Sequence, residues 1–178
     1  AVFSGSSVNY SISAGANGAR IVSGGSDGSD TLVGIERIQF SNVIQATDTS
    51  PGGNTYAAYA MFNAGFNRAP TTNELSLWTS TLDRFGGNTA DLAQTMIDYY
   101  APGVSNEDLV AYLWSTIVGG TIPANALATY TGLVANGTFT QASLLDYVSK
   151  LSLNTDEIVQ IVGTTLNLDP GYFPAPGP

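Results

Sequence analysis

The spacing of apolar residues changes period near residue 55, and this change constrains the fold more than any other feature of the chain. Upstream, Val8, Tyr10 and Ile12 alternate with small polar residues, which is the pattern of a half-buried β-strand. Downstream, apolar residues recur about every 3.6 positions, as they do along one face of an α-helix. The sequence therefore predicts the α+β class, with a small antiparallel β unit at the N-terminus and an all-α domain after it.

Turn-forming residues and prolines mark the expected boundaries. Residues 48–55 are rich in Thr, Ser, Gly and Pro, so we interpret them as a linker between the β unit, residues 1–47, and the helical domain, residues 56–166. Residues 167–178 contain several prolines, which favour an extended C-terminal tail. The chain is thus expected to consist of a β unit, a linker, a helical domain and a tail.

The helical domain contains a predicted internal duplication, with repeat one at residues 56–104 and repeat two at residues 105–166. Aromatic residues, helix-start prolines and leucines recur after 52 or 53 positions: Tyr59 and Tyr112, Pro70 and Pro123, Leu75 and Leu127, Trp78 and Tyr130, Leu92 and Leu144. A duplication would keep such positions in the core, and we expect them to be buried in both repeats. The alternative is two unrelated helical hairpins that share generic amphipathic patterning.

The charge of the chain excludes some classes of partner. Fourteen acidic and five basic residues give a formal net charge of −9. Such a chain repels the phosphates of nucleic acids, and its sequence holds no cluster of Lys and Arg to offset that repulsion. No apolar run reaches the roughly eighteen residues needed to cross a bilayer. We therefore expect neither nucleic-acid binding nor membrane insertion.

The polar composition is typical of exported bacterial surface proteins. Only 11% of the residues are charged, against roughly 25% in ordinary soluble domains, and Ser, Thr, Asn and Gly supply the polarity instead. The absence of Cys is compatible with export. We expect an extracellular or cell-surface location.

The lack of Cys and His also limits the chemistry that is available. These residues supply thiol nucleophiles, the usual general base, and thiolate or imidazole metal ligands. The carboxylate pairs Glu107–Asp108 and Asp156–Glu157 fall in predicted first helical turns, where negative charge stabilises the helix dipole. We expect a protein that is not an enzyme.

A loop rich in Gly and Asp, residues 24–34, is the most specific local motif. Without Cys and His, a metal would be held by oxygen ligands, which points to Ca²⁺ as the one suggested cofactor. Asp27 and Asp30 are the candidate ligands. The alternative is a turn that joins two strands, in which both carboxylates are solvated or cap the backbone.

This loop resembles the glycine- and aspartate-rich repeat of calcium-binding β-rolls, the RTX-type repeats of type I-secreted bacterial proteins. The matching core is Gly28-x-Asp30-Thr31-Leu32-x-Gly34, and residues 28–41 resemble the strand segment that follows such repeats. Only one degenerate copy is present, whereas a β-roll site is built from consecutive repeats. The resemblance thus implies a calcium site with incomplete coordination.

The helical domain resembles the domain-of-unknown-function 4214 family, which often follows such repeats. The matching residues are Tyr59-x-x-Phe62-x-x-x-Phe66-Asn67-Arg68-Ala69-Pro70, Glu74-Leu75-x-x-Trp78, and, in the second copy, Tyr130-Thr131-x-Leu133-x-x-Asn136-Gly137. The resemblance implies a module of large exported proteins, such as surface-layer proteins, adhesins and exoenzymes, with no established enzymatic activity.

Arg68 is expected to have a structural role, because it lies in a neutral loop just before a helix start. It could pair with Glu74 or Asp98, or donate to the carbonyls at a helix end. The second copy departs from the family pattern here, since residues 119–123 contain no basic residue.

Three aromatic residues are candidates for contacts with a partner. Trp114 lies between core-facing Leu113 and Ile117, so it could be exposed. Tyr172 and Phe173 could anchor the tail to its own domain or to a neighbouring molecule. These features favour a non-catalytic, secreted structural module that acts in self-assembly, as a subunit of a surface layer, an adhesin or an extracellular fibre.

The expected partners are therefore further copies of the chain or cell-surface components. The alternative function is a polysaccharide-binding or calcium-dependent adhesion module, attached to a larger exported protein.

Overall fold

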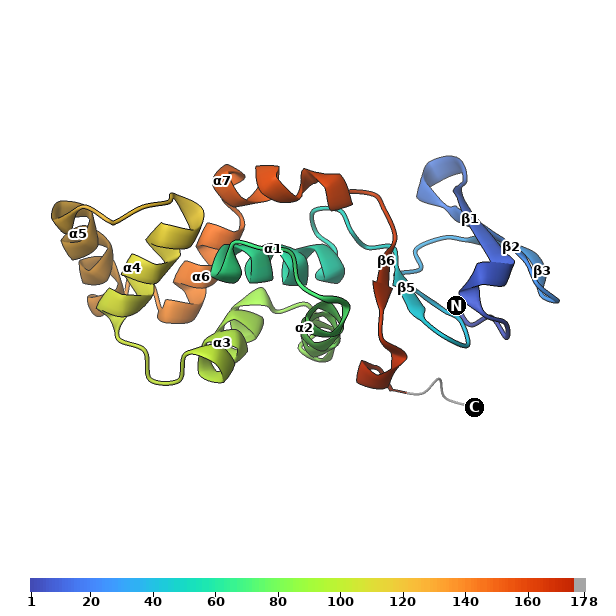
Figure 1. The fold of residues 1–178 in the computed structure, drawn as a ribbon, viewed down its shortest axis with the longest axis horizontal. Coiled ribbons are helices and arrows are strands. Elements are labelled where there is room, and N and C mark those ends of the chain that lie inside the picture. Colours follow the sequence, from blue (N-terminus) through green and yellow to red (C-terminus); the bar gives the residue numbers. More distant parts are fainter. Residues whose placement is uncertain (175–178) are drawn as a thin grey trace.

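The N-terminal part of the chain forms a three-stranded antiparallel sheet with its own small core. The computed structural model describes residues 1–174, and Figure 1 shows this sheet at one end of the long axis of the molecule. Its strands follow the chain order: β1 (Tyr10–Ala14), β2 (Arg20–Gly24) and β3 (Gly28–Leu32). The turn between β1 and β2 places Asn17 and Gly18 in the left-handed region, with φ of 54° and 77°, which Asn and Gly tolerate best.

A second antiparallel sheet lies between this core and the helices. It consists of β4 (Arg37–Gln39), β5 (Ile44–Ala46) and β6 (Leu166–Leu168), with β5 in the centre. Alternate side chains of a strand point to opposite faces. Ile44, Ala46 and Leu168 therefore pack into the helical core, whereas Ile38 packs with Phe3 into the N-terminal core.

β6 brings the C-terminal end of the chain back to the strands near residue 45, so the predicted boundaries at residues 47 and 167 separate strands that pair with each other. The predicted linker, residues 48–55, is packed rather than free. Thr49 is fully buried, and its hydroxyl donates to the Thr164 carbonyl at 2.7 Å. Asn54 and Thr55 already belong to the first helix.

The three-helix plan of repeat one occurs again in repeat two. Residues 1–174 form seven α-helices: α1 (Asn54–Phe66), α2 (Thr72–Arg84), α3 (Thr89–Tyr100), α4 (Asn106–Ile117), α5 (Ala124–Ala135), α6 (Gln141–Ser149) and α7 (Ser152–Thr155). Each of α4, α5 and α6 begins 52 residues after its counterpart α1, α2 or α3. The predicted α+β class and the order of a β unit and two similar helical repeats are thus confirmed.

Burial differs sharply between the two repeats. Trp78 of α2 is 2% exposed, as expected, but its counterpart Tyr130 of α5 is 42% exposed. Tyr59 is buried, whereas its counterpart Tyr112 is 48% exposed. The prediction that both copies bury these aromatics is wrong for repeat two. The reason is that α2 packs against α1, α3 and β6, while α5 packs mainly against α4.

The tail is extended only in part. β6 is a strand, but Pro170–Tyr172 form a short 3₁₀ turn, η4, in which the Asp169 carboxylate accepts a hydrogen bond from the Gly171 amide at 2.8 Å. Such local capping competes with the extended form that prolines favour. Three further 3₁₀ segments are η1 (Ser7–Asn9), η2 (Ala16–Gly18) and η3 (Asp156–Ile161). The last four residues of the predicted tail, 175–178, lie outside the described residues.

Candidate functional site

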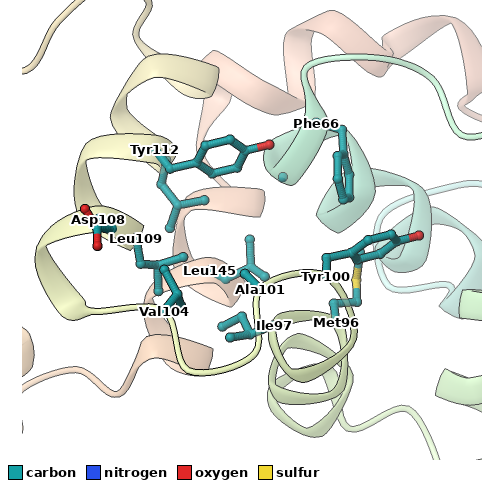
Figure 2. A pocket seen from close by; sticks show the side chains of 12 residues that line it. Phe66, Met96, Ile97, Tyr100, Ala101, Val104, Asp108, Leu109, Tyr112 and Leu145 are labelled. Atoms are coloured by element: carbon teal, nitrogen blue, oxygen red, sulfur yellow. The ribbon is translucent and has the colours of Figure 1, made fainter.

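An apolar pocket of about 350 Å³ lies where repeat one meets repeat two. Figure 2 shows the aromatic rings of Phe66, Tyr100 and Tyr112 around its mouth, with Ala101 and Leu145 between them. The remaining lining comes from α1, α3, α4 and the loop between α3 and α4: Gly65, Met96, Ile97, Val104, Asp108, Leu109 and Leu113. We call this the inter-repeat pocket.

Two polar side chains that line the inter-repeat pocket, those of Asp108 and Tyr100, are hydrogen-bonded within the chain. Ser105 caps α4, because its hydroxyl accepts from the Asp108 amide at 3.0 Å, and the Asp108 carboxylate accepts from the same hydroxyl at 2.7 Å. The Tyr100 hydroxyl accepts from Trp78 Nε1 at 3.3 Å, and burial raises the pKa of Tyr100. Most of the other lining side chains are apolar, so the pocket suits an apolar group.

Arg68 supports one wall of this pocket. Its guanidinium lies 4.8 Å from the centre of the Phe62 ring and 5.8 Å from that of Phe66. It also donates to both carboxylate oxygens of Glu74, at 2.9 and 2.7 Å. Glu74 in turn caps α2 by accepting from the Thr71 amide at 2.8 Å. The ion pair with Arg68 is the main cause that lowers the pKa of Glu74 to about 2.

These contacts are of the structural kind that the sequence suggested for Arg68. Of the partners expected for Arg68, the structure places Glu74 and a carbonyl, that of Ala69, against it. Residues 119–123 of repeat two contain no basic residue, so the Arg68–Glu74 pair occurs once.

A second apolar surface lies on repeat two, where α4, α5 and α6 leave a groove of about 490 Å³. We call it the uncharged groove, because no charged side chain of the described residues lines it. Its lining is Val110, Leu113, Trp114, Ile117, Val118, Tyr130, Leu133, Phe139, Leu144, Tyr147, Val148, Leu151 and Leu153. Of these, Val118, Tyr130, Tyr147 and Leu153 are exposed to solvent.

Trp114 is half-buried and faces this groove rather than standing free. It packs against the helical core, and its ring centre lies 6.2 Å from that of Tyr130, with the two planes 46° apart. Trp114 is thus open to a partner along one side only.

The sequence holds a signal for this surface that the search for motifs missed. Residues 109–145 contain no Asp, Glu, Lys or Arg, although the chain as a whole is strongly acidic. This segment covers most of α4, all of α5 and the first half of α6. Counting charges in a sliding window would have found it.

The C-terminal aromatics lie far from Trp114 in the fold. Phe173 packs against the helical core of its own chain, and the Asp169 amide donates to the Ser76 hydroxyl of α2 at 2.8 Å. Figure 1 places the end of the described chain near the sheets, away from α4 and α5. Phe173 therefore anchors the tail to its own domain, and Tyr172 lies within the adjoining turn η4.

The candidate calcium ligands do not share one site in the structure. The Asp27 carboxylate accepts hydrogen bonds from the Tyr10 hydroxyl and from the amide and hydroxyl of Ser4, and the Tyr10 bond lowers the pKa of Asp27. Asp30 is exposed on β3, opposite Val22. Within residues 1–174, no group of three or more Asp, Glu, His or Cys side chains gathers in a way that could hold an ion. A calcium ion would have to displace the bonds of Asp27, so its binding stays a prediction.

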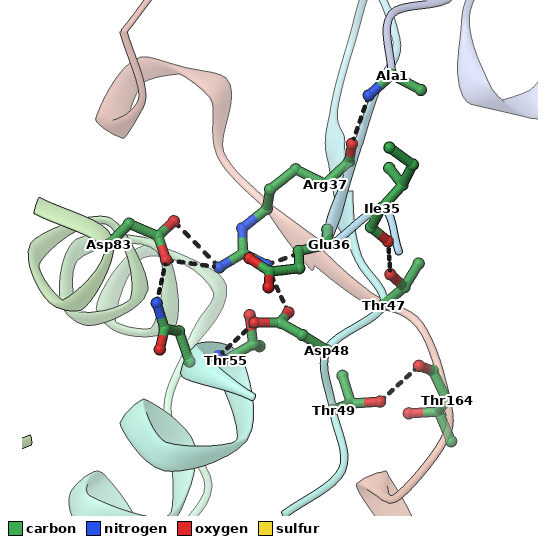
Figure 3. Close-up of polar contacts among 11 residues, drawn as sticks. Ala1, Ile35, Glu36, Arg37, Thr47, Asp48, Thr49, Thr55, Asp83 and Thr164 are labelled. Atoms are coloured by element: carbon green, nitrogen blue, oxygen red, sulfur yellow. Dashed lines mark hydrogen bonds and ion pairs between the residues drawn. The ribbon is translucent and has the colours of Figure 1, made fainter. Parts of the chain in front are cut away.

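A polar clamp, absent from the sequence interpretation, joins the second sheet to the helices. Figure 3 shows Arg37 of β4 between two carboxylates, with Asp48 at 2.5 Å and Asp83 of α2 at 3.0 Å. Asp48 also accepts from the Thr55 amide at 3.0 Å, which caps α1. Asn54 donates to Asp83 at 2.9 Å. The clamp therefore fixes the first turn of α1 and the last turn of α2 to the sheet.

Comparisons of the chain with models of protein families, with curated proteins and with solved structures found no match. The family resemblance of the helical domain therefore stays a prediction. In the described part of the chain, none of the helices combines the length and apolar character that crossing a membrane requires.

Proposed function

We propose that the chain is a non-catalytic structural module of an exported bacterial surface protein and that it acts in self-assembly. Its extracellular or cell-surface location is supported by the low content of charged residues and by the absence of Cys. Self-assembly is supported by the surface of repeat two.

One observation carries this proposal: α5 is rich in apolar residues, yet within residues 1–174 none of its side chains is fully buried, and Ala126, Leu127 and Val134, which pack against the helical core, are only half-buried. Its polar side chains are those of Asn125, Thr129 and Thr131, and the Thr129 hydroxyl is already bonded to the Asn125 carbonyl at 2.8 Å. A helix that is apolar all round is normally buried in a core. The uncharged groove beside α5 adds exposed aromatic and aliphatic side chains, which mark interaction surfaces in soluble proteins.

The non-catalytic part of the proposal is supported by the roles of the paired carboxylates. Glu107 and Asp108 lie in the first turn of α4, where negative charge is favourable. Glu157 accepts from the Asn63 amide group at 3.2 Å and helps to hold η3 against α1. These groups therefore have structural uses.

Sedimentation velocity over a concentration series, with and without millimolar calcium, tests the proposal. We expect the sedimentation coefficient to rise with protein concentration as chains associate. A single monomeric species from micromolar to near-millimolar concentration, in both buffers, would contradict self-assembly.

Polysaccharide binding is the second candidate function, because Trp114 and Tyr130 line one groove. Their planes are 46° apart, so they do not form the flat platform on which a sugar ring stacks best. Binding to arrayed bacterial glycans that is lost in Trp114→Ala would favour this candidate over self-assembly.

Calcium-dependent adhesion has its own test in a calorimetric titration. Calcium heats that appear with the native chain and vanish in Asp27→Asn would place an ion in the N-terminal loop.

A further inference from the structure

We propose that Asn136, in the turn between α5 and α6, is an acceptor site for an N-linked glycan. The donor is a sugar that a diphosphate activates at its anomeric carbon, and a glycosyltransferase makes the transfer. This proposal rests on the proposed export of the chain, because the Asn-x-Ser/Thr triplet marks N-linked glycans in surface loops of secreted proteins. It gives a chemical use to a turn that the proposed function leaves unused.

Two segments of the chain have the sequence of such an acceptor, Asn9-Tyr10-Ser11 and Asn136-Gly137-Thr138. A pattern of three residues also arises by chance, so the surroundings of each asparagine have to distinguish them. Both asparagines are exposed, and exposure alone does not separate the two triplets. The contacts of the hydroxyl residue two positions later do.

The backbone around Asn136 forms a fixed and exposed turn. The Phe139 amide donates to the Leu133 carbonyl at 3.1 Å, so the chain closes back onto the end of α5. Gly137 has a φ of 81°, which glycine adopts without a steric penalty. Residues 135–138 are all exposed, and an enzyme can therefore reach Asn136 without unfolding either helix.

The side chain of Asn136 is oriented by Thr138. Its oxygen accepts from the Thr138 amide at 2.9 Å and from the Thr138 hydroxyl at 2.7 Å. A backbone N–H can only donate, so the atom that faces it must be Oδ1 and not Nδ2. Nδ2 is thus turned away from the amide of the turn, and it donates to no atom of residues 1–174.

The proposed transfer needs this free nitrogen. Nδ2 of Asn136 bonds to the anomeric carbon of the sugar, and the bond from that carbon to the diphosphate oxygen breaks. The diphosphate leaves with the bonding electrons, and Nδ2 gives up one proton to a base of the transferase. The acceptor triplet requires the hydroxyl of Thr138 as well as the carboxamide. These two groups are already in contact here, so binding to the enzyme has little left to order.

The triplet at Asn9 differs in both respects. The Ser11 hydroxyl lies on β1 and is used across the sheet, 3.0 Å from the Ser23 hydroxyl and 3.3 Å from the Ser23 carbonyl. The Asn9 carbonyl accepts from the Gly25 amide at 3.1 Å. A transferase would have to strip this segment from β2 before it could bind the triplet. We therefore expect no glycan on Asn9.

Mass spectrometry of the chain isolated from the outer surface of the cells that produce it tests the assignment. Chymotrypsin places the two asparagines in different peptides, and electron-transfer fragmentation keeps a sugar on the residue that bears it. The peptide with Asn136 should carry a hexose or an N-acetylhexosamine on most chains, and the peptide with Asn9 should carry none. Detection of the sugar itself separates this result from deamidation of the Asn136–Gly137 bond.

Substitutions at Thr138 test the motif while Asn136 stays at the end of α5. Thr138→Val keeps the shape of the side chain but removes the hydroxyl, and most of the glycan should be lost. Thr138→Ser is the matched control and should keep the glycan. Asn9→Gln should change nothing. Far-ultraviolet circular dichroism equal to that of the native chain shows that each variant is folded.

The outcomes separate this proposal from the proposed function. Chain that is found at the cell surface with no sugar on Asn136 overturns the acceptor site but leaves export and self-assembly standing. A glycan on Asn9 instead of Asn136, or equal glycan on Thr138→Val and on the native chain, also overturns it. Chain that is recovered only from the cell interior overturns the proposed location, whatever Asn136 carries.

Discussion

Helices α2 and α5 hold the same position in the two repeats but have different surroundings. α2 is covered by α1, β6 and η4, and its stripe of small polar residues, Ser76, Thr79 and Ser80, is buried beneath them. The corresponding stripe of α5, Ala128, Thr131 and Gly132, is covered to a far lesser degree by the described chain. One repeat thus completes its core within the chain, and the other presents the equivalent helix to solvent.

The difference shows that helix formation and helix burial have separate origins in this molecule. Start signals are local and recur in both copies: Asn88 caps α3, and Thr140 caps α6 at the equivalent position. Burial of α2 depends on residues far along the chain, since β6 begins at Leu166. The two repeats therefore share their helix plan, but β6 covers only α2.

The largest expected effect on stability comes from Trp78, compared with its counterpart Tyr130. Trp78→Ala should lower the free energy of unfolding by about 4 kcal/mol, because a large side chain is removed from a packed core. Tyr130→Ala should cost less than about 1 kcal/mol at concentrations where the chain is monomeric. Urea unfolding followed by circular dichroism measures both. Equal losses would mean that α5 is buried in the monomer.

The clamp that joins the sheet to α2 should have the next largest effect. Arg37→Ala leaves the carboxylate of Asp48, only 6% exposed, without its cationic partner, and should cost about 3 kcal/mol. Repeat two has Ala135 at the position of Asp83, so no similar clamp acts on α5.

Arg84→Ala is the matched control for the clamp, since among residues 1–174 the Arg84 side chain bonds only within α2, to the Thr81 hydroxyl. Its urea midpoint should stay near that of the native chain. If the urea midpoint of Arg37→Ala also equals that of the native chain, the clamp does not help to hold α2 in place.

Low pH should lower the stability of repeat one, because it protonates Glu74. The pKa of Glu74 is lowered from its ordinary 4.5 to about 2, so the folded state favours the ionised carboxylate. The resulting stability is present above about pH 4.5 and is lost as the pH falls toward 2. Glu74→Gln should be less stable at neutral pH by on the order of 1 kcal/mol, a value reduced by the half-exposed position of Arg68.

Urea unfolding between pH 2 and pH 7 measures this effect. The profile of Glu74→Gln should be flatter than that of the native chain between pH 4.5 and pH 2. Parallel profiles would show that the Arg68–Glu74 pair adds nothing to repeat one. Repeat two has no basic residue at positions 119–123 and has Ala126 at the position of Glu74, so it has no such pair.

The smallest expected loss of stability comes from the helix caps, which occur at equivalent positions in both repeats. Asn88→Ala and Thr140→Ala each remove a side chain that accepts from the amides of the first helical turn, and each should cost about 1 kcal/mol. Similar losses in urea unfolding would support equivalent local signals in both copies. A loss at Asn88 alone would show that α6 does not depend on its cap.

The sequence predicted the elements better than their packing. Hydrophobic spacing is local, so the predicted repeat starts, residues 56 and 105, lie within two residues of the first residues of α1 and α4, Asn54 and Asn106. Pairing of β6 with β5 could not be predicted, because Leu166–Leu168 has too few residues for a strand pattern and its partner lies over a hundred positions away. The composition of residues 48–55 likewise predicted a linker but could not predict that Thr49 is buried against Thr164.

The candidate site was predicted less well, for the same physical reason. Arg68 was expected to pair with Glu74 or Asp98 or to bond helix-end carbonyls, and the structure pairs it with Glu74. Trp114 was expected to be exposed, but it is half-buried and lines the uncharged groove. Tyr130 and Tyr112 were expected in the core because they match Trp78 and Tyr59 of repeat one, which were expected to be buried. Whether an apolar residue is buried depends on which other elements pack over it. The repeat pattern does not show which elements pack over each helix.

Amide hydrogen exchange measured at several chain concentrations compares α2 and α5 most directly. Protection of α2 should not depend on concentration, because its cover belongs to the same chain. Protection of α5 should increase as the concentration rises, over the same range in which sedimentation shows association. Protection of α5 that is the same at low concentration and at high concentration, while the chains associate, would contradict the claim that repeat two supplies the surface for self-assembly.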